Sequence, residues 1–129
     1  MGGCGGNGRL SHGAFVQQAD AVCSAYNARV PRAVTKPKSY AAVEAYVART
    51  LPLYEAALRK LDELEPPSRD AAGVQTWLAA DRRESRALRN LGLAARRRDF
   101  PGVTAAAAQA RTASRDAKRA AARLGLHVC

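Results

Sequence analysis

The sequence predicts an all-α protein folded as an up-down four-helix bundle. Apolar residues recur at helical spacing along four stretches of the chain, prolines and glycines fall between these stretches, and no stretch alternates as a β-strand does. With 129 residues the chain is long enough for one modest core. Because the expected connections are short, successive helices should run antiparallel.

The first helix is expected over 12–30, where Ser11 is a suitable N-cap. A connector that contains two prolines follows, and the second helix is expected over 39–65. Pro52 lies inside this second stretch. A proline there removes one backbone donor and clashes with the preceding turn, so the helix should be kinked or broken near Pro52.

Two consecutive prolines end the second helix. A third helix is expected over 69–97, capped by Ser68 or Asp70, and an alanine-rich fourth helix over 101–124, with Gly125 as its stop. The residues expected to face inward on these two helices are Val74, Leu78, Leu88, Leu91, Ala95, Val103, Ala106, Ala110, Ala113, Ala117, Ala120 and Leu124.

Cys23 lies in the first predicted helix, and Cys129 is the last residue. An antiparallel bundle places the start of the first helix and the end of the fourth at the same end, so the tail after Gly125 can fold back to bring Cys129 to Cys23. A disulfide there would close a loop of about 100 residues and stabilise the domain by about 4–5 kcal/mol. Two unrelated thiols are the alternative.

Residues 1–10 are rich in glycine and are expected to form a flexible leader, whereas 11–129 form the bundle domain. The run Gly2-Gly3-Cys4-Gly5-Gly6 resembles the end of a bacterial lipobox. This resemblance implies that Cys4 is lipidated and that the leader is the remnant of a lipobox region. The apolar signal segment that precedes such a motif is not part of this sequence, and a coincidental match is the alternative.

Longer runs of the body carry a second resemblance. They are Phe15-Val16-Gln17-Gln18-Ala19-Asp20-Ala21-Val22-Cys23, Leu64-Glu65-Pro66-Pro67, Trp77 and Leu124-Gly125-Leu126-His127-Val128-Cys129. The chain over 11–129 resembles small, alanine- and arginine-rich helical envelope lipoproteins of actinobacterial type, whose function is uncharacterised. The resemblance implies a paired first-helix and terminal cysteine and an extracytoplasmic location. Its motifs are structural, so it implies no activity.

The chain is basic, with 21 lysines and arginines against 11 acidic residues and a net charge of +10. If the third and fourth helices adjoin, their arginines form a basic surface that suits an anionic membrane or wall polymer. A solvated surface that reflects composition alone is the alternative. Few aromatic residues lie among the arginines, so specific nucleic-acid recognition is not expected. The residues of this surface are Arg82, Arg86, Arg89, Arg96, Arg111, Arg115 and Arg119.

Catalytic and cofactor motifs are not found: the sequence has no phosphate-binding glycine loop, no His-Glu-x-x-His and no Cys-x-x-Cys-His. We therefore expect neither enzyme activity nor a cofactor. His12 and His127 lie near Cys23 and Cys129 in the predicted fold and suit zinc or copper, which leaves a small metal or haem carrier as an alternative. A disulfide between Cys23 and Cys129 would occupy the sulfurs that such a metal site needs.

Three residues on the third helix have two interpretations each. Asp81 and Glu84 lie near its apolar side, either on a flank that reaches solvent or in a polar pocket of the core. Trp77 is either a packing residue or a contact for a ligand in a groove.

The prediction for function is a non-enzymatic extracytoplasmic lipoprotein, a monomeric binding or interaction module of the cell envelope whose ligand is unknown. The alternative is a cytoplasmic basic helical protein that binds nucleic acid nonspecifically.

Overall fold

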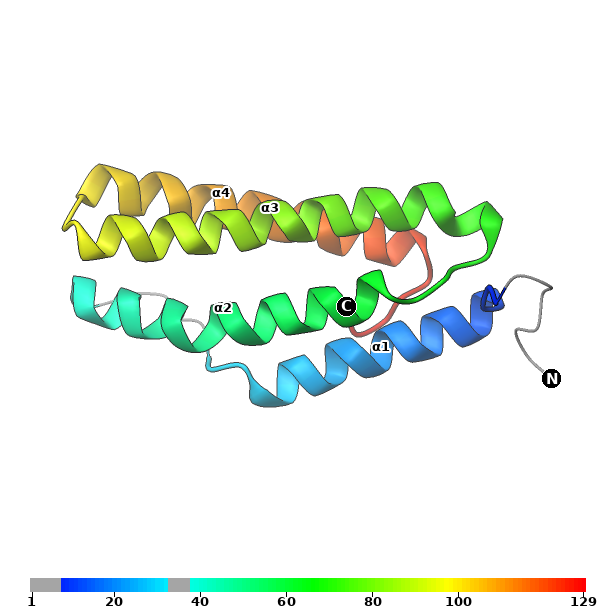
Figure 1. Ribbon diagram of the computed structural model, residues 1–129. Helices are drawn as coiled ribbons and strands as arrows, with labels where there is room; N and C mark the ends of the chain where they lie inside the picture. Colours follow the sequence, from blue (N-terminus) through cyan, green and yellow to red (C-terminus); the bar gives the residue numbers. More distant parts are fainter. Residues whose placement is uncertain (1–7, 33–37) are drawn as a thin grey trace.

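The computed structural model describes residues 8–32 and 38–129, and Figure 1 shows its helices running antiparallel in chain order. Within the described residues there are four α-helices, a single 3-10 turn and no β-strand, which confirms the all-α up-down bundle. The elements are α1 (His12–Arg29), α2 (Tyr40–Asp62), the 3-10 turn η1 (Ser68–Asp70), α3 (Ala71–Arg96) and α4 (Phe100–Arg123).

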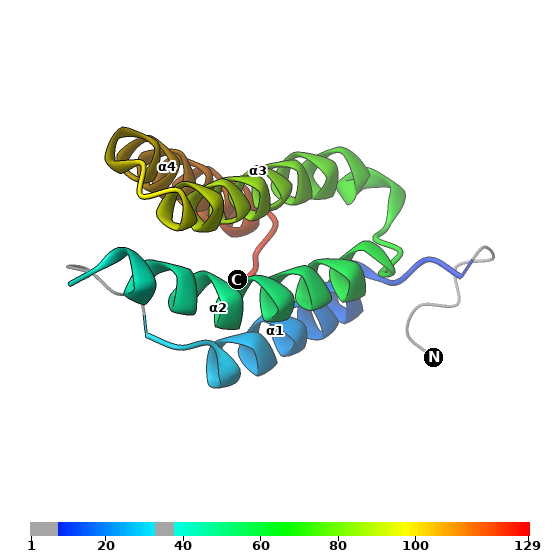
Figure 2. The ribbon, with the colours of Figure 1, turned by 60° about the vertical axis from the view of Figure 1, so that its left-hand side comes forward.

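The four helices do not overlap over their full lengths. α1 has 18 residues, against 23 in α2 and 26 in α3, and it lies beside only the C-terminal part of α2 (Figures 1 and 2). One hydrophobic core therefore includes residues of all four helices and the C-terminal tail, around Phe15, Trp77 and Leu126. A second core, around Val47 and Leu88, is built from α2, α3 and α4 alone.

Side-chain caps fix where three of the helices begin. The Ser11 hydroxyl accepts a hydrogen bond from the Ala14 amide at 3.1 Å, and the Ser39 hydroxyl accepts one from Ala42 at the same distance. Asp99 accepts from the Gly102 amide at 3.1 Å at the start of α4. These bonds satisfy amide groups that the first turn of a helix leaves without a partner.

Asp70 stands at the N-cap position of α3, as predicted, but makes no capping bond. Its carboxylate instead lies 2.7 Å from Nδ1 of His12. The contact ties the first turn of α1 to the start of α3, so Asp70 joins two helices and does not cap one.

Pro52 lies inside α2, and the helix is continuous across it. Of the two outcomes predicted there, a break is excluded. The side chain is exposed, whereas Val47 and Thr50 on the same helix are buried, so the proline ring lies on the solvent side. The other predicted outcome, a kink at the missing backbone donor, is compatible with the continuous helix.

The C-terminal tail folds back onto α1. Leu126 is buried in the first core, and the Cys23 and Cys129 sulfurs lie 2.08 Å apart, which confirms the predicted disulfide. The Asp20 carboxylate accepts hydrogen bonds from the backbone amides of His127 and Val128, the shorter at 2.9 Å. Asp20 therefore holds the tail in place beside the disulfide.

The boundary of the leader differs from the prediction. The Leu10 amide donates to the Glu65 carbonyl at 2.7 Å, and the Arg9 guanidinium donates to the Pro66 carbonyl at 3.0 Å. Leu10 also packs against the first core, so these two residues belong to the domain. The predicted lipidation site, Cys4, lies outside the described residues.

Candidate functional site

A cavity of about 150 Å³ opens at the middle of the bundle, next to the disulfide. All four helices and the tail line it, and the tail lies against the middle of α1 at Asp20 and Cys23. Its lining residues are Cys23, Tyr26 and Asn27 of α1, Tyr54, Ala57, Leu58 and Leu61 of α2, Trp77, Asp81 and Glu84 of α3, Ser114, Ala117 and Lys118 of α4, and Val128 and Cys129 of the tail.

Two carboxyl groups lie in this pocket. Asp81 and Glu84 are three residues apart on α3, so both reach the same side of the helix. The Tyr54 hydroxyl of α2 lies 2.9 Å from Oδ1 of Asp81 and 3.1 Å from Oε1 of Glu84. A phenol has a single hydrogen to donate, so the two carboxyl groups share it, or one of them is protonated and donates to the phenol oxygen.

The surroundings of the two acids disfavour their ionised forms. Burial raises the pKa of Asp81 from 3.8 to about 6, although the Tyr54 hydrogen bond and Arg82 oppose this change. Burial also raises the pKa of Glu84 from 4.5 to about 7, and the nearby Asp81 charge adds to the effect. The same burial and the two carboxylates raise the pKa of Tyr54, so its hydroxyl stays protonated.

Aromatic rings border the pocket on two sides. Tyr26 of α1 meets Tyr54 edge to face, with ring centroids 5.6 Å apart. Trp77 is only 2 % exposed and meets Phe15 in the same manner at 6.5 Å. Trp77 is therefore a packing residue, which was the first of its two predicted interpretations. It also lines the pocket.

For Asp81 and Glu84 the structure decides between the two interpretations. Both are half-buried and line the pocket of the bundle, as the pocket interpretation holds. Sequence reasoning did not identify Tyr54 of α2 as their partner. It also missed Asp20, for which only the fold-back of the tail provides a role.

Some arginines of the predicted basic surface form ion pairs with α2, and the others do not. Three of its α3 arginines face acidic residues of α2: Arg82 binds Asp62 at 2.7 Å, Arg89 binds Glu55 at 2.6 Å and Arg96 lies 3.3 Å from Glu44. The arginines follow a seven-residue spacing, and their partners recur along one side of α2. The spacing places each set on one side of its helix, but it does not by itself pair the two sets.

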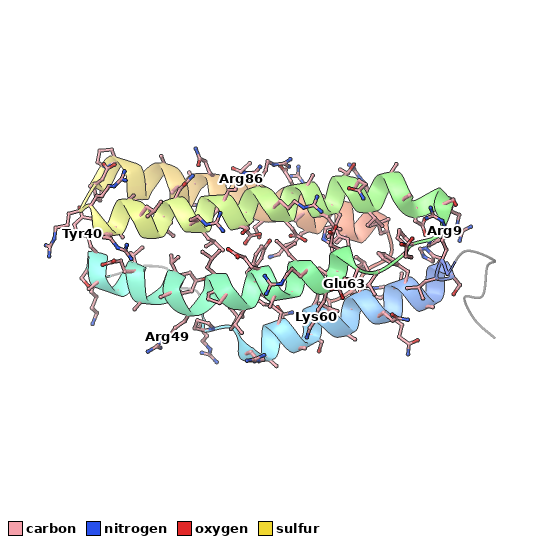
Figure 3. All side chains as sticks on the ribbon, viewed as in Figure 1. Arg9, Tyr40, Arg49, Lys60, Glu63 and Arg86 are labelled. Carbon is pink, nitrogen blue, oxygen red and sulfur yellow. A yellow bond between two sulfur atoms is a disulfide. The ribbon has the colours of Figure 1, made fainter. Side chains whose placement is uncertain are left out.

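The other predicted cations lie on the side of α3 and α4 away from α2. Figure 3 shows Arg86 on this side, and it lines a shallow groove with residues of α4. Arg111, Arg115 and Arg119 are exposed on α4, whose single acidic residue is Asp116. Within 8–32 and 38–129, none of these three forms an ion pair.

The residues considered for a metal site do not come together. His12 contacts Asp70, the two cysteines bind each other, and the His127 amide binds Asp20. In the part of the chain that the structure describes, no group of three or more His, Cys, Asp or Glu residues is placed to hold a metal ion.

No described helix combines the length and the apolar character needed to cross a membrane. Comparison of the chain with protein-family models, curated proteins and solved structures gives no match. The resemblance to envelope lipoproteins therefore stays a prediction.

Proposed function

We propose that this chain is a non-enzymatic binding module that works outside the cytoplasm, is anchored by a lipid on Cys4, and holds a small ligand in the mid-bundle pocket. The observation that carries the proposal is the place of the disulfide, since Cys23 and Cys129 form part of the pocket wall. Disulfides persist in oxidising compartments. In such a compartment the disulfide stays intact, and so does the part of the pocket lining that it forms.

The composition of the pocket supports ligand binding. Binding sites for small molecules are concave and mainly apolar, with a few polar groups that orient the ligand. Here Leu58, Leu61 and Trp77 supply apolar wall, and Asp81 and Glu84 supply the polar groups. The domain has the parts of a receptor for a molecule with one polar end.

The exposed cations of α4 support contact with an anionic membrane. A cation near an anionic bilayer gains about 1 kcal/mol, so Arg111, Arg115 and Arg119 together would orient a lipid-anchored domain. We expect the protein to sediment with vesicles of anionic phospholipid and not with zwitterionic vesicles. The triple variant R111Q/R115Q/R119Q should lose this binding, whereas equal binding to both vesicles would contradict it.

The same exposed cations favour the second candidate, a cytoplasmic protein that binds nucleic acid nonspecifically. That function requires binding to duplex DNA that persists at moderate salt and weakens as salt rises. Such binding, together with no preference for anionic vesicles, would replace the first proposal.

The location is tested by thiol chemistry and by the gene. In native lipid-anchored protein purified without reductant, we expect no thiol that reacts, because Cys4 carries the lipid and the other two cysteines are paired, and reduction should expose two thiols. The genomic sequence upstream of Met1 should encode a basic segment and then an apolar one. Freely reactive Cys23 and Cys129 in the native protein would contradict an extracytoplasmic location.

A further inference from the structure

The two carboxyl groups of the pocket have spare acceptor capacity. Each has one oxygen near Tyr54, and within the described residues neither Asp81 nor Glu84 forms an ion pair. The neighbouring cation on α3, Arg82, binds Asp62 instead. An ionised carboxylate in half-buried surroundings is costly unless a cation or a donor joins it.

The size and the walls of the cavity limit what could join them. An apolar protein cavity of about 150 Å³ is large enough for benzene, and this pocket has the same volume. Apolar side chains and the Trp77 ring surround the space beside the carboxyl groups. Tyr26 and Tyr54 add ring faces and edges, and aromatic faces attract cations.

We propose that the pocket binds a small organic cation, a protonated amine on a compact apolar body, with the amine between Asp81 and Glu84 and the body against Trp77, Leu58 and Leu61. This proposal rests on the proposed function, because it names the class of ligand that the pocket holds. The protein surface as a whole is basic and Lys118 lies at the pocket, so the selectivity must come from the two carboxyl groups.

The test uses three probes of one shape: cyclohexylammonium, cyclohexanol and cyclohexanecarboxylate. Trp77 is the single tryptophan of the chain and lines the pocket, so its fluorescence reports binding. At pH 8 and fixed ionic strength we expect the ammonium ion to bind about tenfold more tightly than the alcohol, the gain typical of a hydrogen bond to a charged group. The carboxylate should bind most weakly.

Two variants with the same change in net charge locate the effect. D81N/E84Q should abolish the preference for the ammonium ion, because it removes both negative charges from the pocket. E44Q/E55Q removes two negative charges from residues outside the pocket and should keep the preference. If circular dichroism shows D81N/E84Q to be unfolded, D81N alone should weaken the preference.

The outcomes separate the two proposals. Equal affinity for the ammonium ion and the alcohol in the natural protein would overturn the cation assignment and leave the pocket as a binding site. Equal loss of preference in both double variants would also overturn it, since the effect would then follow net charge. No response to any of the three probes would overturn both proposals.

Discussion

Asp81 and Glu84 make the stability of the protein depend on pH. Their pKa values in the folded state, about 6 and about 7, exceed the ordinary values of 3.8 and 4.5, so folding favours their protonated forms. The favourable contribution is complete below about pH 4 and is lost as the pH rises to about 7. From pKa changes of this size, we expect a loss of a few kcal/mol.

The variant D81N/E84Q isolates this contribution, because asparagine and glutamine do not titrate. We expect it to be more stable than the natural protein at pH 8 and to match it near pH 4, measured by urea unfolding at both values. E44Q/E55Q is the control, since the surface ion pairs of Glu44 and Glu55 should each contribute less than about 1 kcal/mol. A natural protein that gains stability from pH 4 to 8 relative to D81N/E84Q would contradict the assigned directions.

Gly125 ends α4 in a backbone conformation that favours glycine. Its φ of 87° lies in the left-handed region, and no side chain crowds the position closer than 3.6 Å. We therefore expect G125A to lower the stability by about 1 kcal/mol through the backbone alone. G13A is the matched control: Gly13 lies in α1 with open space around it, so alanine there should raise the melting temperature.

At the level of single helices, α2 contains a proline, Pro52, whose replacement should stabilise the helix. Pro52 is exposed and interrupts the hydrogen bonds of a helix that is otherwise continuous. P52A restores one backbone donor, and we expect a gain of about 1–2 kcal/mol, less than the full penalty of an interior proline because proline also restricts the unfolded chain. Thermal unfolding measures the change, and a lower melting temperature would indicate that the ring makes contacts that the helix needs.

The helices themselves could be predicted from the sequence because their periods, caps and stop signals are local. Ser11 caps α1 and Gly125 follows α4 as predicted, and the inward residues Leu78 and Leu91 are buried. The pairing of Arg89 with Glu55 was missed, because it depends on how α2 and α3 are rotated against each other. The residue pattern of a single helix does not determine how that helix is rotated against its neighbour.

Across the whole molecule, the pocket could be predicted only as one of two alternatives. The sequence places Asp81 near the apolar side of α3, but its burial depends on how the other helices and the tail pack around it. The disulfide was predictable because bundle topology alone brings its two ends together. A site lined by four helices and a tail required the packed structure.

The Cys23–Cys129 disulfide should supply much of the stability of the domain. It joins residues 106 positions apart, and on the chain-entropy model a loop of that length contributes about 4–5 kcal/mol. We expect C23S/C129S to lose stability of that order in urea unfolding. C4S is the matched control and should unfold like the natural protein, since Cys4 has no part in the bond.

Reduction of the natural protein should reproduce the effect of C23S/C129S and should leave that variant unchanged. We expect the tail to keep its hydrogen bonds to Asp20 when the disulfide is absent, so that part of the pocket wall then depends on Asp20. D20N combined with C23S/C129S should therefore weaken probe binding at Trp77 further than either change alone. If the double serine variant were as stable as the natural protein, the tail would be held by burial of Leu126 and by Asp20, without a contribution from the disulfide.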